Sequence, residues 1–227
     1  MRPLLLLLAL LAACGRPLTP AETAFLAPIH GATLDAARVR LHANPAVGLF
    51  PITYDARPRI TCREKIAPPA TRARITARTA GIVLFERLLL NPVYAFPDFA
   101  APLPTDRGPA LDLGAAMFLA HEMTHVWQWQ NRDLTGYHPR RAFAEQVLID
   151  DPYLFETDGA PFLSYGYEQQ ASLVEEYLCC ATLDPGGART ARLHAMLRPV
   201  LPVAPPDAFP RRVIVYWGAD LDGICSA

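Results

Sequence analysis

The segment from Leu111 to Gln130 constrains the fold more than any other part of the sequence. It contains no proline, and its apolar residues lie nearly all round the helix that it would form. Such a distribution is typical of a helix that is buried on most of its sides. Asp112 is available near its start as a capping residue. We therefore expect a central helix over residues 111–130, on which the other elements pack.

This helix carries the pentad HEMTH at residues 121–125. His121 and His125 are four residues apart, so they share one helix face and both imidazoles can reach the same ion. Glu122 lies one step round the helix, where its carboxylate can reach a water molecule beside the ion without being a ligand. A buried, unpaired glutamate between two histidines would be costly without an ion. The pentad predicts one Zn²⁺ per chain, with Glu122 as the catalytic base.

A catalytic zinc ion usually has three protein ligands, so a third ligand is required. The metzincin continuation is absent, because Gln128 and Asn131 stand where it needs glycine and histidine. Glu168, at the start of a later predicted helix, is our prediction, with an exposed surface glutamate as the alternative interpretation. Glu175, two turns further along the same face, is either a partner of a ligand or the ligand itself. Weaker candidates for the third ligand are His138, Asp150 and Asp151.

HExxH followed by a glutamate on a later helix resembles the gluzincin division of zinc metallopeptidases. Three blocks, LTPAE…IHGATLDAARVRLH, LAHEMTHVWQ and YGYEQQASLVEEY, more closely resemble a group of bacterial zincin-like proteins with an HExTHVxQ core. Members of this group often occur with contractile injection and secretion systems. The resemblance runs from Leu18 to about Tyr177 and implies a zincin-like fold. It assigns His121, His125 and Glu168 to zinc and Glu122 to catalysis, and it implies no substrate.

The remaining pattern predicts an α+β domain. Thr19, Glu22 and Gly31 delimit a first helix as N-cap, capping-box partner and stop. Further helices are expected at 142–149, 165–183 and 188–198, and extended segments at 39–44, 72–79, 81–90 and 211–217. Residues 45–69 and 91–109 are rich in proline and are expected to be irregular. We expect one domain over residues 14–227, with a small mixed or antiparallel sheet on the HExxH helix and a Pro-rich C-terminal extension from about residue 199.

The N-terminus predicts export. Arg2 precedes an apolar run from Leu4 to Ala13 that is too short to span a bilayer, as in a secretory signal peptide over residues 1–13. The residues LAAC resemble a bacterial lipobox, which implies that Cys14 is lipidated; an ordinary signal peptide is the alternative. Gly15 is not the aspartate associated with inner-membrane retention. The expected location is the cell envelope, with a lipid anchor in the outer membrane facing the periplasm.

Four cysteines remain, namely Cys62, Cys179, Cys180 and Cys225. An exported protein with an even number of cysteines can form disulfides, but four cysteines allow three pairings and the sequence does not choose among them. Because Cys179 and Cys180 are adjacent, we expect them to pair with different partners or to remain as small buried residues.

These observations favour a membrane-anchored zinc-dependent hydrolase, foremost a metallopeptidase acting on a peptide or protein. The alternatives are a catalytically inactive zincin-like scaffold or binding lipoprotein with a structural zinc, and a hydrolase of peptidoglycan cross-links. A net charge of −1 gives no indication of nucleic-acid binding. The oxyanion of a peptidase also needs a hydrogen-bond donor. Candidates by residue type are Tyr137, His138, Tyr165 and Tyr167.

Overall fold

The computed structural model describes residues 15–155, 159–215 and 218–226. Cys14 and the predicted signal peptide over residues 1–13 lie outside the described residues. The α-helices are α2 (Pro20–His30), α3 (Cys62–Ile66), α4 (Leu113–Gln130), α5 (Arg132–Thr135), α6 (Pro139–Leu148), α7 (Tyr167–Leu183) and α8 (Ala188–Leu197). The strands are β1 (Arg40–Ala43), β2 (Pro51–Asp55), β3 (Arg74–Arg78), β4 (Gly81–Leu84), β5 (Arg87–Leu90), β6 (Leu111–Asp112) and β7 (Val213–Ile214). The predicted α+β class is confirmed.

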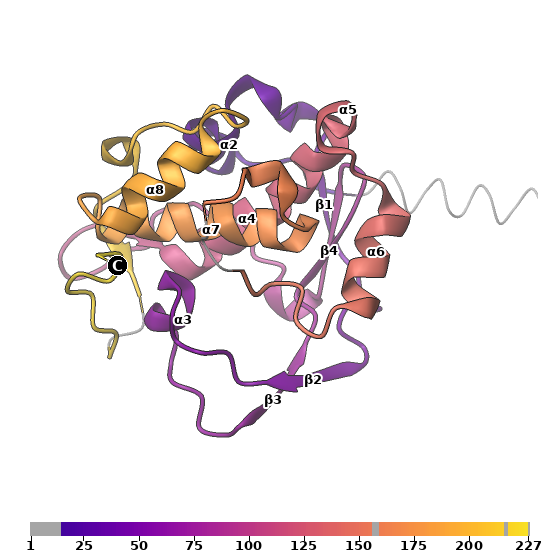
Figure 1. Ribbon diagram of the computed structural model, residues 1–227, viewed down its shortest axis with the longest axis horizontal. Helices are drawn as coiled ribbons and strands as arrows, with labels where there is room; N and C mark the ends of the chain where they lie inside the picture. The colour runs from indigo at the N-terminus through magenta and orange to yellow at the C-terminus, as the bar shows by residue number, and fades with distance from the viewer. Residues whose placement is uncertain (1–14, 156–158, 216–217, 227) are drawn as a thin grey trace, which may run out of the picture.

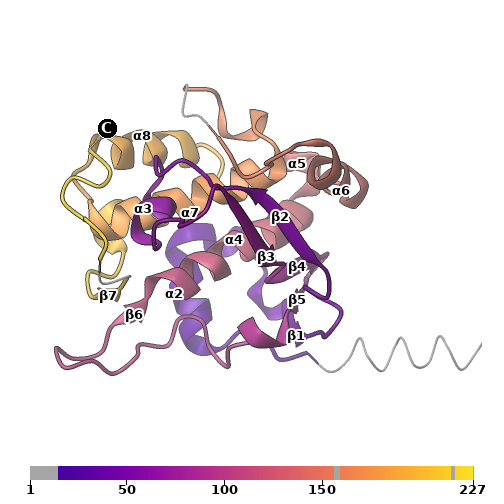
Figure 2. The same ribbon diagram turned by 90° about the horizontal axis from the view of Figure 1, so that it is seen from below.

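Helix α4 runs through the middle of the molecule, with α7 beside it (Figures 1 and 2). It also contacts β4 and α2. Every residue from Leu119 to Gln128 is buried, as the all-round apolar pattern predicts. The helix begins at Leu113 rather than at Leu111, because residues 111–112 form β6 and pair with β7. Asp112 is the N-cap, and its Oδ1 accepts a hydrogen bond of 3.0 Å from the backbone N–H of Ala115.

The sheet next to α4 has three strands in the order β1-β5-β4. β1 is parallel to β5, and β4 is antiparallel to β5, so the sheet is mixed. The prediction of one extended segment over 81–90 is wrong, since the chain reverses at Phe85 and Glu86 to form the hairpin β4–β5. Phe85 has a positive φ of 60°. Its ring packs 4.6 Å from that of Trp129 on α4, which favours this conformation.

Residues 45–69 are not irregular throughout, contrary to the expectation. β2 forms a two-stranded antiparallel sheet with β3, which lies more than fifteen residues further along the chain. The second element in the segment is α3, which begins at an N-cap threonine, Thr61, whose hydroxyl accepts from the backbone N–H of Glu64 at 3.4 Å. Neither element is longer than five residues. Elements this short depend on long-range pairing rather than on local periodicity, so the proline-rich composition concealed them.

The boundaries of the other helices follow their caps. Thr19 and Glu22 form the predicted capping box of α2. Helix α6 starts at Pro139 rather than at residue 142, because His138 is its N-cap and proline is favoured at the first helical position. The strand predicted over 211–217 is much shorter in the structure, where Val213–Ile214 pair with β6. Residues 216–217 are not among the described residues.

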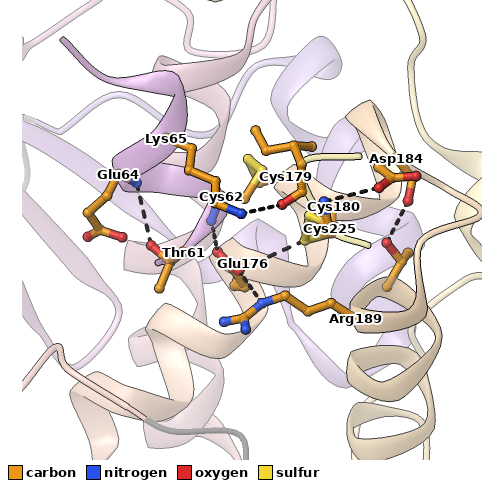
Figure 3. Close-up of a disulfide and its surroundings, with 12 residues drawn as sticks. Thr61, Cys62, Glu64, Lys65, Glu176, Cys179, Cys180, Asp184, Arg189 and Cys225 are labelled. Atoms are coloured by element: carbon orange, nitrogen blue, oxygen red, sulfur yellow. Dashed lines mark hydrogen bonds and ion pairs between the residues drawn. A yellow bond between two sulfur atoms is a disulfide. The ribbon is translucent and has the colours of Figure 1, made fainter. Parts of the chain in front are cut away.

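The C-terminal segment packs into the core. Leu201, Phe209 and Ile224 are buried in the same hydrophobic cluster as α4 and α7. Two disulfides fix the pairing that the sequence left open: Cys62 bonds to Cys179, and Cys180 bonds to Cys225 (Figure 3). The expectation that the adjacent cysteines take different partners is therefore confirmed. Among the described residues, none of the helices combines the length and the apolar character needed to cross a membrane.

Candidate metal centre

Three predicted ligands meet where α4 and α7 lie side by side. His121 and His125 come from the middle of α4, and Glu168 comes from the first turn of α7. Oε2 of Glu168 lies 3.2 Å from Nε2 of His121 and 3.2 Å from Nε2 of His125. One ligand atom from each of the three residues falls within 4.8 Å of the others. The group is buried and can hold a metal ion.

The spacing of these atoms fits a tetrahedral ion. Zinc–ligand bonds of about 2.0–2.1 Å at a tetrahedral angle separate the ligand atoms by roughly 3.3 Å. The distances of 3.2 Å agree with that separation. A charge-assisted N–H···O hydrogen bond is usually shorter, at about 2.7–2.9 Å. The geometry thus suits ligands arranged about a shared ion better than a pair of direct histidine–carboxylate hydrogen bonds.

The other ring nitrogen of each histidine is held by a protein acceptor. Nδ1 of His121 lies 3.2 Å from Oε2 of Glu175, and Nδ1 of His125 lies 2.9 Å from Oε1 of Gln128. The amide nitrogen of Gln128 donates to the carbonyl of Tyr167 and to Oε1 of Gln170, so its oxygen is left for His125. Both histidines therefore donate from Nδ1 and present Nε2 to the ion, which is the arrangement expected around a metal.

The electrostatics of the group favour a cation. Burial alone lowers the pKa of His121, but the carboxylates of Glu168 and Glu175 raise it to about 10. The pKa of His125 is also raised, because Glu168 outweighs the effect of burial. Burial raises the pKa of Glu168, yet the two histidines hold it well below its usual range. The metal-free group thus holds protons at the atoms that would bind a metal ion, and a bound ion would compete with them.

We expect this competition to appear as proton release. At about pH 7 a pKa of about 10 keeps His121 protonated in the metal-free chain, and the raised pKa of His125 increases its protonated share, whereas a metal ion takes only neutral imidazole. Binding of zinc should therefore release about one to two protons. Two histidines with an ordinary pKa of about 6.5 would together release well under one proton at the same pH. Calorimetry in buffers of different ionisation enthalpy measures this number. Release of less than half a proton would contradict the raised pKa values.

A cleft of about 420 Å³ opens onto the centre. Its lining includes residues of β2 and β3, residues 150–153, and both His121 and Glu122. In the described part of the chain, the Glu122 carboxylate has no hydrogen-bond or ion-pair partner. A side chain at Gly81 would come within 2.9 Å of Oε1 of Glu122, so this position leaves room for the carboxylate. Burial raises the pKa of Glu122, and the neighbouring histidines partly offset the effect.

The cleft contains a tyrosine that sequence reasoning missed. Tyr153 lines it, and the centroid of its ring lies 5.9 Å from the centroid of the His121 ring. The guanidinium of Arg57 lies over the tyrosine ring, 4.8 Å from its centroid. Its hydroxyl oxygen accepts from Nε2 of Gln146 at 3.1 Å, which leaves the hydroxyl proton free to donate. Gln146 also donates to Oε1 of Glu168 at 2.6 Å. Tyr153 stands in a loop without periodicity, so its sequence context offered no signal.

The four oxyanion candidates chosen by residue type do not line this cleft in the described structure. Tyr137 is buried with its ring 4.9 Å from that of Tyr167, and the hydroxyl of Tyr167 donates to the carbonyl of Gly136. His138 caps α6, and Tyr165 precedes α7.

The weaker third-ligand candidates lie away from the ligand group. Asp151 pairs with Arg57 at 2.6 Å, Asp150 lines the outer cleft, and His138 accepts from the backbone N–H of Arg140. Glu175 contacts Nδ1 of His121, whereas the ligand group is formed around the Nε2 atoms of the two histidines. Of the two roles left open for it, the geometry favours the partner of a ligand.

The threonine of HEMTH has a structural role that also escaped the sequence analysis. Thr124 is fully buried, and its hydroxyl lies 3.1 Å from Nε2 of His30 on α2. Burial lowers the pKa of His30 to about 3, so this imidazole is neutral. The contact joins α2 to α4 next to the second histidine of the pentad. His30 is the last residue of α2, just before a helix-stopping glycine, and this position gives no local indication of such a contact.

The fold and the site together define an α+β protein whose two central helices assemble a buried His/His/Glu group able to hold a metal ion. No protein-family model and no curated protein sequence matches the chain. Among solved structures, the chain is similar to the effector domain of Pseudomonas aeruginosa VgrG2b, with a TM-score of 0.50 and 22% sequence identity. The match covers 84% of this chain and 86% of that chain. At this identity the likeness concerns the fold alone.

Proposed function

We propose that the protein is a zinc-dependent hydrolase, and specifically a metallopeptidase of zincin-like fold. The observation that carries the proposal is the cleft that opens onto both His121 and Glu122. Three protein ligands leave one position of a tetrahedral ion open, which is typical of catalytic zinc, whereas structural zinc usually has four protein ligands. An inactive scaffold with a structural zinc would need neither the open position nor a carboxylate without partners beside it.

The residues of the cleft suit peptide hydrolysis. A zinc ion held by His121, His125 and Glu168 would supply a Lewis acid and lower the pKa of water at the open position. Glu122 takes one proton from the attacking water and delivers it to the leaving amine, as the new C–O bond forms and the peptide C–N bond breaks. Tyr153 can donate its hydroxyl proton in a hydrogen bond to the oxygen that becomes negatively charged.

Replacement of Tyr153 by phenylalanine is expected to lower kcat by about 10²–10³-fold, the usual effect of removing one oxyanion donor. The zinc content should not change, because Tyr153 contacts the ligands only through its ring. Steady-state kinetics with metal analysis measures both quantities. Tyr94→Phe, a matched change on the exposed η3 turn (Pro92–Tyr94), should leave both unchanged. A kcat close to the wild-type value would exclude Tyr153 as the donor.

The proposal as a whole is tested with the purified chain. We expect about one zinc ion per chain and cleavage of a broad peptide library, with loss of cleavage in a chelator and recovery on adding zinc. Zinc without cleavage would favour the scaffold, and a chain that takes up no zinc would overturn the proposal. Digestion of muropeptides instead of peptides would indicate that cross-links of peptidoglycan are the substrate.

The cell-envelope location belongs to the same proposal. Two disulfides support it, because disulfides form and persist in oxidising compartments such as the bacterial periplasm. A lipid on Cys14 would place the described domain next to the membrane, since the domain begins only a few residues further on. The VgrG2b domain is described as an effector domain. As part of the same proposal, we infer an effector role for the present chain.

A further inference from the structure

A continuous set of contacts leads from the Cys62–Cys179 disulfide to the ligand group. Arg63 follows the disulfide-bonded cysteine on α3, and its Nη1 lies 3.0 Å from Oε2 of Glu175. The same oxygen lies 3.2 Å from Nδ1 of His121. Arg63 and His121 therefore share one carboxylate oxygen, and the position of the guanidinium bears directly on the orientation of a predicted metal ligand.

Glu175 depends on both of these contacts. Its side chain is almost completely buried, and a buried carboxylate requires a charged or hydrogen-bonding partner. Burial alone would raise the pKa of Glu175. Arg63 and His121 outweigh this effect of burial and hold the pKa below its usual range. Arg63 in turn is oriented by Glu64, whose Oε1 accepts from its Nε and Nη2. Among the described residues, loss of Arg63 would leave His121 as the one hydrogen-bonding partner of this carboxylate.

Helix α3 cannot hold Arg63 in place by itself. It has five residues, which is far below the length at which a helix is stable alone. The disulfide fixes its first residue to α7 across a sequence separation of 117 residues, and the backbone N–H of Cys62 donates to Oε2 of Glu176 at 2.8 Å (Figure 3). Lys65 of α3 donates to the carbonyl of Ile224 at 2.8 Å. A cross-link over so long a loop removes much of the freedom that α3 would otherwise have.

We propose that Arg63 is a positioning residue for the metal centre, and that the Cys62–Cys179 disulfide is required to keep it on Glu175. This inference rests on the proposed metal site. It implies that the reduced chain binds zinc weakly, and that the metal site is completed when the Cys62–Cys179 disulfide forms. The second disulfide, Cys180–Cys225, ties the C-terminal segment to the next position of α7 and makes no direct contact with Arg63 or Glu175 among the described residues. It does adjoin α3, because its sulfurs lie within 4.8 Å of the Cys62 sulfur and Lys65 donates to Ile224, the residue before Cys225. Its removal therefore serves as the comparison for an indirect effect on Arg63.

The first test is zinc affinity measured by competition with a chromophoric chelator. Arg63→Met should weaken zinc binding by about 10–100-fold, as expected for loss of a group that supports a ligand. Arg63→Lys keeps a positive charge and should recover part of the loss. Arg72→Met, on the exposed connection between α3 and β3, should bind zinc like the wild type. Thermal unfolding of the metal-free chains separates a change in affinity from a change in fold.

The second test removes each disulfide in turn. The paired change Cys62→Ala and Cys179→Ala should weaken zinc binding to a similar extent, and adding Arg63→Met should cause little further loss, because both changes act on one contact. Cys180→Ala with Cys225→Ala should cause a smaller loss, because this change leaves Cys62 bonded to α7. Unchanged affinity of Arg63→Met, or equal losses on removing either disulfide, would overturn the inference while zinc binding by the wild type stands. A wild-type chain without zinc affinity would overturn the metal site as well.

Discussion

Glu122→Gln is expected to lower the rate of peptide hydrolysis by about 10²–10⁴-fold, the usual contribution of a positioned general base. Glutamine has nearly the same shape, so it fits the space beside Gly81, but its amide cannot accept and return a proton. The zinc content should stay at about one ion per chain, because Glu122 lies outside the ligand group. Kinetics on a cleaved library peptide and metal analysis of the same sample give both values.

The matched control for this change is Glu86→Gln. Glu86 lies in the turn between β4 and β5, and its carboxylate pairs with the exposed Arg38. Surface ion pairs of this kind contribute little to stability. Its hydrolysis rate and zinc content should equal those of the wild type. If Glu122→Gln retained the wild-type rate, a group other than Glu122 would accept the proton. If the variant lost its zinc, Glu122 would be part of the metal site rather than the base.

Glu168→Ala is expected to lose zinc. Structural and catalytic ions bind with about 10–16 kcal/mol shared among three or four ligands, so one ligand accounts for several kcal/mol and well over a 100-fold change in affinity. The loss has a second cause, since Glu168 is the carboxylate that lies next to both imidazoles. Without it, the two buried histidines lose the carboxylate oxygen that lies 3.2 Å from the Nε2 atom of each. Equilibrium dialysis against buffered zinc measures the change.

Glu175→Gln provides the comparison for Glu168→Ala. A group that orients a ligand typically contributes about 10–100-fold to metal affinity, so this variant should retain measurable zinc binding. The order of the two effects decides between the two glutamates. A larger loss for Glu175→Gln than for Glu168→Ala would make Glu175 the third ligand and would exchange the roles that the geometry assigns.

The parts of the site that could be predicted are those set by helical periodicity. The spacing of His121 and His125 places two imidazoles on one face, and the all-round apolar pattern places that face in the core. Glu168 stands at the start of a later predicted helix, where the resemblance to gluzincins implies a glutamate ligand. The histidine pair thus needs the geometry of one helix alone, whereas Glu168 needs a second helix beside it, and the three residues lie together in the structure.

The parts that escaped prediction are set by contacts between distant segments. Tyr153 lies on a loop, and Arg63 lies on a helix of five residues. Neither element is long enough to show a hydrophobic period that reveals which side chain points inward. The disulfide pairing depends on the path of the chain between residues 62 and 179, which local propensity does not determine. The strand β2 is recognisable only once β3 is beside it.

The consecutive cysteines of α7 also determine how the molecule responds to proteolysis. The two disulfides close adjoining covalent rings, one over residues 62–179 and one over residues 180–225. A single cut within either ring leaves both fragments bonded to each other, and the only peptide bond between the rings joins two fully buried residues inside a helix. An envelope protease that nicks an exposed loop between Cys62 and Cys225 would therefore leave every proposed zinc ligand on one covalently connected molecule.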